Sequence, residues 1–151
     1  MSTDQIKKTV FLQASRARIW KALSDINEFG DWFGVKLNGQ LVPGSHLRGK
    51  VTHQGYEHYP FEIMIDRVEP RRLLSWRWHP NAVDSKVDYS SEPTTLVVFE
   101  LEDAPGGTQL TLVESGFDGI PESRRSEAHR GNEQGWTMQM ESIQRHITQA
   151  A

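Results

Sequence analysis

The 151-residue chain contains no cysteine. This absence excludes disulfide bonds, zinc sites built on thiolates and cysteine nucleophiles. A dominant charge is also missing, because 17 lysines and arginines stand against 20 aspartates and glutamates, for a net charge of −3. Neither sign forms a long block along the chain. Bulk charge therefore gives no reason to expect a nucleic-acid partner.

Long apolar runs are absent as well. The longest is Leu96–Phe99, four residues, whereas a membrane-spanning helix needs about 20. The N-terminus has no apolar core of the kind that signal peptides carry. We therefore expect no membrane insertion, no secretion and a cytoplasmic location. The length, with 36% hydrophobic residues, five tryptophans and six phenylalanines, predicts one folded domain over residues 1–151.

Alternation of apolar and polar residues covers most of the chain and is typical of strands with one buried face. Proline and glycine separate the alternating stretches, and the polar stretch 80–93 is expected to be a long loop. We predict strands over residues 5–13, 45–53, 59–69, 72–79, 94–102 and 108–117.

Helical signals stand at two places. Ser15 can cap a short helix after the first strand, and residues 27–30 allow a turn or a second short helix before Trp32. The strand signal ends at Pro121, and a long C-terminal helix follows. Its apolar stripe, at offsets of four, seven and eleven residues, consists of Trp136, Met140, Ile143 and Ile147.

Two glycines, Gly131 and Gly135, lie inside this predicted helix. Each costs about 1 kcal/mol relative to alanine in a helix interior. We interpret them as sites of close approach or of a bend. A later helix start, near Ser126, is the alternative.

These elements predict an α+β domain in which a strongly curved antiparallel sheet wraps around the C-terminal helix. A curved sheet cannot contact a straight helix along its full length. An apolar cavity lined by Trp and Phe can therefore remain between them.

The whole chain resembles the helix-grip superfamily of START lipid-transfer domains, the birch-pollen allergen and polyketide cyclases (SRPBCC). Within it, the chain is most similar to stand-alone proteins resembling the C-terminal domain of the activator of the heat-shock chaperone Hsp90 ATPase. The segments that carry this resemblance are residues 14–23 (ASRARIWKAL), 31–34 (DWFG), 42–44 (VPG), 68–73 (VEPRRL), 78–80 (WHP), 95–101 (TLVVFEL), 107–110 (GTQL), 114–117 (ESGF) and 132–136 (NEQGW).

The resemblance implies a deep pocket for a small hydrophobic or amphipathic molecule, and it brings no shared set of catalytic residues. Members of the superfamily have enzyme-like, chaperone-related and transport roles. The chaperone activator engages its chaperone through a separate N-terminal domain. Because 151 residues leave no room for such a domain, we do not expect chaperone-ATPase stimulation here.

Side chains predicted to face the helix are the candidate ligand contacts, and filling the core is the alternative role for each. Aromatic side chains provide a large contact area at a small entropy cost. Trp20 and Trp32 are assigned mainly to packing of the short helices. The candidates are Phe61, Ile63, Ile65, Trp76, Trp78, Val97, Phe99, Glu114, Asn132, Trp136 and Met140.

Glu114 shares a row with Leu110 and Leu112, so its carboxylate should point inward unless the strand bulges near Gly116. A buried carboxylate must be paired, hydrogen-bonded or protonated. Asn132 and the region of Gly131 could supply partners. Glu114 then either orients a ligand or acts as a base, or it holds the start of the last helix to the sheet.

Other reactive residue types form weaker patterns. His53 falls on an inward row and is the second candidate for proton transfer, with His58 near a turn. No third ligand stands at a known metal spacing, so we expect no metal. His129 and Glu133 lie one helical turn apart and suit either part of a site or a surface pair. Residues 123–126 carry two arginines and are interpreted as a solvated helix end.

Nucleotide and hydrolase motifs are missing. Residues 105–108 form a hairpin turn without the spacing or the following helix of a phosphate loop, and no Gly-x-Ser-x-Gly occurs. We expect no cofactor. The predicted function is binding of a small hydrophobic or amphipathic molecule. A cyclase- or aromatase-type enzyme and a chaperone-related interaction module are the alternatives, and homodimerisation stays open.

Overall fold

The computed structural model of the chain describes residues 4–52, 54–57, 59–80 and 88–149. It confirms an α+β architecture with one curved antiparallel sheet, ordered β1-β7-β6-β5-β4-β3-β2. The elements are β1 (Gln5–Leu12), α1 (Arg16–Ser24), α2 (Ile26–Phe33), β2 (Val35–Asn38), β3 (His46–Val51), β4 (Pro60–Glu69), β5 (Leu73–Trp78), β6 (Thr95–Ala104), β7 (Gly107–Ser115), the 3₁₀ turn η1 (Phe117–Gly119) and α3 (Glu122–Gln149).

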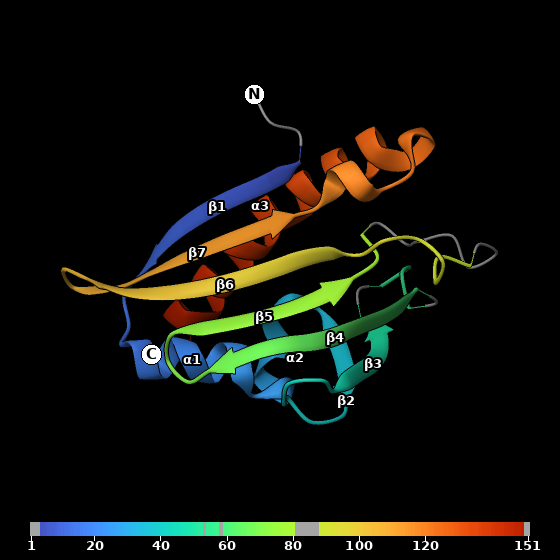
Figure 1. The fold of residues 1–151 in the computed structure, drawn as a ribbon. Coiled ribbons are helices and arrows are strands. Elements are labelled where there is room, and N and C mark those ends of the chain that lie inside the picture. Colours follow the sequence, from blue (N-terminus) through green and yellow to red (C-terminus); the bar gives the residue numbers. More distant parts are fainter. Residues whose placement is uncertain (1–3, 53, 58, 81–87, 150–151) are drawn as a thin grey trace.

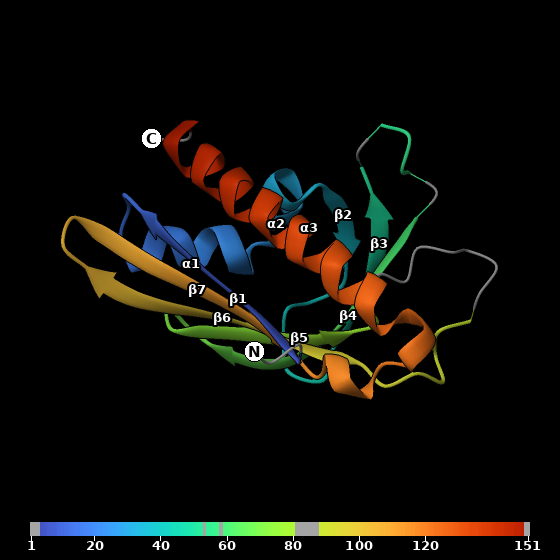
Figure 2. The ribbon, with the colours of Figure 1, turned by 90° about the horizontal axis from the view of Figure 1, so that it is seen from above.

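The three α-helices lie on the same side of the sheet, and α3 crosses it diagonally (Figures 1 and 2). At ~1.5 Å per residue, the 28 residues of α3 extend about 42 Å. Its expected apolar stripe is buried against the concave face of the sheet. No helix within the described ranges is long and apolar enough to cross a membrane.

Three sequence expectations need correction. The chain forms a short strand, β2, at the edge of the sheet, which the alternation analysis did not find. The second helix extends through Trp32 and Phe33 instead of ending before them. The last helix begins at Glu122, so the alternative start near Ser126 is wrong.

A register shift occurs where β4 pairs with β5, between Ile65 and Arg67. Ser75 on β5 fills the irregularity, since its hydroxyl accepts from the Arg67 N–H at 3.1 Å and lies 3.0 Å from the Asp66 carboxylate, to which it donates. Ser75 is therefore buried, although the alternation places its side chain on the other face of β5 from that of Leu74. No bulge turns Glu114 outward, so the alternative proposed near Gly116 is wrong.

Side-chain caps fix the two short helices. The Ser15 hydroxyl accepts from Arg18 N–H, as predicted, and the Asp25 carboxylate accepts from the Asn27 and Glu28 N–H groups at 3.0 Å. α2 ends at Phe33 and is capped by Gly34, whose φ of 88° is left-handed. These caps determine where the chain turns from α2 into β2.

Carbonyl groups at the end of α2 accept hydrogen bonds from side chains of α3. Gln139 Nε2 donates to Phe33 O at 2.8 Å, and the Ser142 hydroxyl donates to Trp32 O. A helix leaves its last carbonyls without intrahelical partners. α3 supplies these partners and thereby holds the α2–β2 junction in place.

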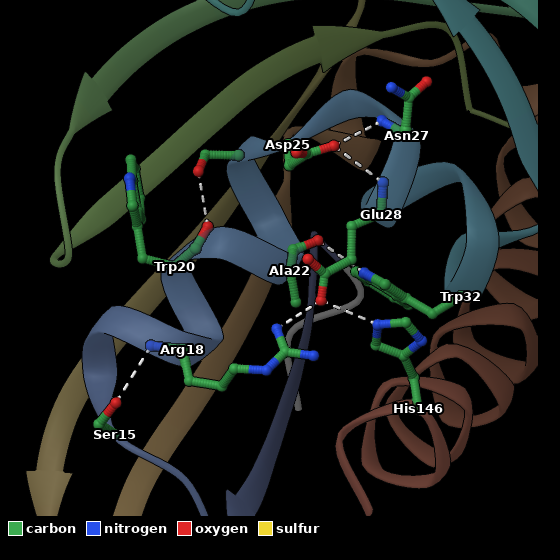
Figure 3. A network of polar contacts seen from close by, with 10 residues as sticks. Ser15, Arg18, Trp20, Ala22, Asp25, Asn27, Glu28, Trp32 and His146 are labelled. Carbon is green, nitrogen blue, oxygen red and sulfur yellow. Dashed lines mark hydrogen bonds and ion pairs between the residues drawn. The ribbon is translucent and has the colours of Figure 1, made fainter. Parts of the chain in front are cut away.

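A polar cluster of Glu28, Arg18 and His146 joins the three α-helices (Figure 3). One Glu28 oxygen accepts from the Arg18 guanidinium and lies 3.0 Å from His146 Nε2. Burial alone would raise the pKa of Glu28, whose side chain is 13% exposed, but the hydrogen bonds from His146 and Arg18 lower it below its usual value. The cluster anchors α1 and α2 to the last turns of α3.

This cluster predicts a pH-dependent contribution to stability. Because the folded-state pKa of Glu28 lies below the unfolded value, the unfolded chain binds the proton first as the pH falls. The contribution is present above the unfolded pKa and is lost as the pH falls through the folded pKa. We expect Glu28→Gln to lower the free energy of unfolding by roughly 1–2 kcal/mol near neutral pH, with a difference that shrinks on acidification.

Urea unfolding of wild type and Glu28→Gln, from neutral pH down through the pKa of Glu28, measures the difference in their free energies of unfolding. Arg18→Met removes one of the two donors and should raise the pKa of Glu28, which NMR of the carboxyl group detects. A stability difference between wild type and Glu28→Gln that stays constant on acidification would contradict this assignment.

Candidate functional site

A pocket of about 330 Å³ lies between the middle of α3 and the strand ends of β2 to β5. Its volume is at the lower end of the usual range for small-molecule sites, ~300–1,000 Å³. One wall comes from the α2–β2 junction and another from α3. The lining residues are Phe33, Gly34, Val35, Val51, Phe61, Trp78, Asn132, Gly135, Trp136 and Gln139.

Four of the lining aromatic rings contact one another in a closed circuit. Ring centroids are 5.4 Å apart for Phe33 and Phe61, and 5.8 Å for Phe61 and Trp78. Trp78 and Trp136 follow at 5.7 Å, and Trp136 returns to Phe33 at 5.9 Å. Such edge and tilted contacts fix each ring by its neighbours. The apolar wall is therefore a preformed surface.

Glu114 lies behind this wall, fully buried. One of its oxygens accepts from Trp136 Nε1 at 2.8 Å and from Asn132 Nδ2 at 3.0 Å. The other accepts from Trp78 Nε1 at 2.8 Å, from the Thr95 hydroxyl at 2.5 Å and from Asn132 Nδ2 at 3.1 Å. The carboxylate thus joins β5, β6 and β7 to α3.

Donor groups surround the Glu114 carboxyl group. Indole N–H groups and the amide NH₂ only donate, and a carboxylate only accepts. Within the described part of the chain, no lysine, arginine or histidine forms an ion pair with Glu114. Because four side chains enclose the carboxylate, it does not line the pocket. This geometry favours its role in holding the helix to the sheet, with Asn132 as the expected partner.

The structure divides the candidate ligand contacts into two groups. Phe61, Trp78, Asn132 and Trp136 line the pocket. The rest of the apolar candidates do not line it and belong to the buried core: Ile63, Ile65, Trp76, Val97, Phe99 and Met140. The catalytic candidate His53, like His58, lies outside the described residues.

Six lining residues escaped the sequence analysis: Phe33, Gly34, Val35, Val51, Gly135 and Gln139. The α3 members carry a recognisable signal, because Asn132, Gly135, Trp136 and Gln139 follow one another at offsets of three, four and seven, which places them on one helix face. A Cβ at Gly135 would meet nothing within 4 Å. Gly135 therefore leaves open space at the pocket and does not mark a close approach.

The remaining polar candidates do not line the pocket and form contacts with other parts of the protein. His129 Nε2 lies 3.2 Å from Gln5 O, while Glu133 pairs with Lys8 at 2.8 Å. Arg124 pairs with Glu92 at 2.7 Å, and Arg125 donates to Ile120 O. The two arginines are thus tied to the protein, while Ser123 and Ser126 beside them are exposed, so this helix end is solvated in part. Among the residues described, no group of three His, Asp or Glu could hold a metal ion.

A comparison with known protein families identifies the family of this chain. The family described as Activator of Hsp90 ATPase homolog 1-like protein matches residues 13–148. The chain belongs to this family. The match covers the pocket-lining residues, Glu114 with the side chains that donate to it, and almost all of α3. No protein among the curated ones matches the chain.

Solved structures of similar proteins share the fold of this family member. MLL2253 of Mesorhizobium loti superposes with a TM-score of 0.76 at 19% identity, over 97% of this chain and 98% of that one. The Aha1 dimer from Colwellia psychrerythraea gives 0.69 at 18%, over 95% of each chain. DynU16, a protein in the dynemicin biosynthetic locus, gives 0.73 at 25%, over 96% of this chain and 47% of that longer one.

Proposed function

We propose that this protein binds a small apolar or amphipathic molecule in the pocket between α3 and the ends of β2 to β5. The observation that carries the proposal is the preformed aromatic wall of Phe33, Phe61, Trp78 and Trp136 around about 330 Å³ of space. Ligand sites are concave and mostly apolar, with a few polar groups that fix orientation. Asn132 and Gln139 are such groups.

Binding is favoured over acid–base catalysis by the chemistry of the lining. No lining residue in the described ranges has a side chain that titrates near neutral pH. General acid–base catalysis needs such a group within hydrogen-bond reach of the substrate, and Glu114 is enclosed by its own donors. A cyclase-type reaction is the second candidate, because DynU16 belongs to a biosynthetic locus. In that case the pocket would act mainly by holding its substrate in one shape.

A chaperone-related partner, a homodimer and a cytoplasmic location belong to the proposal as well. The family name supports a chaperone-related partner, and the Aha1 dimer from Colwellia psychrerythraea supports a homodimer. The lack of cysteine, which suits a reducing compartment, supports a cytoplasmic location.

NMR of the five tryptophan indole N–H groups tests the binding proposal. The probe is 2-naphthalenemethanol, a neutral molecule with a flat apolar body. We expect the indole signals of Trp78 and Trp136 to shift and saturate during the titration, because both rings line the pocket. Trp20 on α1 is not part of the lining and serves as the internal control. Shifts that do not saturate, or that affect Trp20 equally, would contradict the proposal.

A further inference from the structure

The indole N–H of Trp76 has no hydrogen-bond acceptor among the residues that the structure describes. Trp76 is 1% exposed, so bulk water does not reach this group either. A buried donor without an acceptor is costly, and native proteins keep few of them. The nearby indole N–H groups of Trp78 and Trp136 both donate to Glu114. Trp76 is therefore the indole of this aromatic cluster whose N–H remains available to a ligand.

A second, smaller cavity of about 10 Å³ lies beside Trp76, and we call it the inner cavity. Its lining comes from α1, α2, β2, the β2–β3 loop, β4 and β5. Among the described lining residues, Trp76 alone has a side chain with a hydrogen-bonding group. A cavity of about 10–15 Å³ has room for one water-sized group, but a buried water typically makes about three hydrogen bonds. The lining side chains offer one donor and no acceptor, so the inner cavity suits an atom of a ligand better than a water molecule.

The inner cavity and the pocket are adjacent layers on the helix-covered face of the sheet. On three strands, the residue that lines the pocket and the residue that lines the inner cavity are two positions apart and therefore share this face. The pairs are Val35 and Leu37 on β2, Phe61 and Ile63 on β4, and Trp78 and Trp76 on β5. Because two strand residues span about 7 Å, the two layers are about 7 Å apart.

Phe33 lies at the boundary between the two spaces. It lines the pocket, and its ring stacks at a centroid distance of 4.7 Å on Phe29, which lines the inner cavity. The ring centroid of Phe33 also lies 6.3 Å from that of Trp76. A phenylalanine in a helix has two common χ1 rotamers. The boundary can therefore open toward the pocket by rotation of one side chain.

We infer that the ligand carries a neutral hydrogen-bond acceptor, a carbonyl oxygen, at the end that enters the inner cavity, where this oxygen accepts from Trp76 Nε1. Rotation of Phe33 admits this end, and the apolar body stays against the aromatic wall of the pocket. A carbonyl only accepts and so brings no unsatisfied donor of its own. A charged group would lose its hydration in an apolar cavity that offers one donor. The inference rests on the proposed function and names the chemical class of its ligand, flat apolar carbonyl compounds.

Two compounds of nearly the same shape test the inference on the wild-type protein. They are 2-acetylnaphthalene, a ketone, and 2-isopropenylnaphthalene, an alkene in which a CH₂ group replaces the ketone oxygen. NMR follows the indole N–H groups, and the Trp76 signal is assigned from its contacts with the rings of Phe29 and Phe99. We expect both compounds to shift the signals of Trp78 and Trp136. Only the ketone should move the Trp76 signal downfield, because it alone brings an acceptor and the ring-current effects of the two compounds are the same.

A variant adds a readout of affinity. Trp76→Phe keeps an aromatic ring and removes the N–H. The ratio of ketone to alkene affinity should fall about two- to tenfold in this variant, the loss of about one hydrogen bond. Comparing the ratio between proteins cancels the effect of the smaller ring on packing. Trp20→Phe is the matched control, because Trp20 lines neither space, and its ratio should equal that of wild type.

The outcomes separate this inference from the proposed function. If both compounds give saturable shifts at Trp78 and Trp136, but the ketone moves the Trp76 signal no further downfield than the alkene does, the inference is wrong and the pocket still binds ligands. A folded Trp76→Phe that keeps the wild-type affinity ratio leads to the same conclusion, and the wild-type NMR result decides alone if this variant does not fold. If neither compound gives a saturable shift at Trp78 or Trp136, the proposed function and the inference both fail.

Discussion

Glu114→Leu should destabilise the protein more than any other single substitution near the pocket. Leucine is similar in size but accepts no hydrogen bond. Donors of Trp78, Trp136, Thr95 and Asn132 would then lose their shared acceptor in a buried place. Each unsatisfied buried donor costs about 1–3 kcal/mol, and such costs are not simply additive. We expect a loss of roughly 3 kcal/mol or more.

Glu114→Gln should cost less, roughly 1–3 kcal/mol. Glutamine keeps one oxygen, but its NH₂ replaces the other and would face a donor, either Trp136 Nε1 or Trp78 Nε1. Urea unfolding measures both losses as a lower midpoint at unchanged slope. The control is Glu102→Leu, since Glu102 is exposed on the neighbouring strand β6. If both Glu114 variants had the same midpoint as the control, the hydrogen bonds described around Glu114 would be contradicted.

The sheet and its faces were predictable because alternation reports directly which side of a strand is buried. Leu110, Leu112 and Glu114 lie two residues apart, and this period alone placed a carboxylate inside. The same reasoning fails for β2, because four residues are too few to show a period. Ser75 shows a second failure, since a register shift in the neighbouring strand buried a residue on the polar side.

The pocket was only partly predictable, because its second wall depends on how helices pack. Phe33, Gly34 and Val35 line it because α3 holds the end of α2 through Gln139 and Ser142. Pairwise contacts between distant segments leave no periodic trace in either segment. Neither alternation nor helical spacing could therefore distinguish lining residues from core residues such as Trp76 and Phe99.

The open space at Gly135 is part of the proposed binding site, so Gly135→Leu should abolish binding without harming the fold. A Cβ there meets nothing within 4 Å, so the leucine side chain can extend into the pocket. Replacing a glycine inside a helix also favours the helical state by up to about 1 kcal/mol. We expect unchanged or slightly raised stability, together with an affinity for 2-naphthalenemethanol lowered at least about tenfold.

Gly131→Leu is the matched control, because Gly131 is an exposed glycine of the same helix and does not line the pocket. The decisive measurement is the fluorescence titration of wild type, Gly135→Leu and Gly131→Leu with this probe. Saturable binding in wild type and Gly131→Leu, and its loss in a folded Gly135→Leu, is the result we predict. Equal affinity in all three proteins would contradict the assignment of this pocket as the binding site.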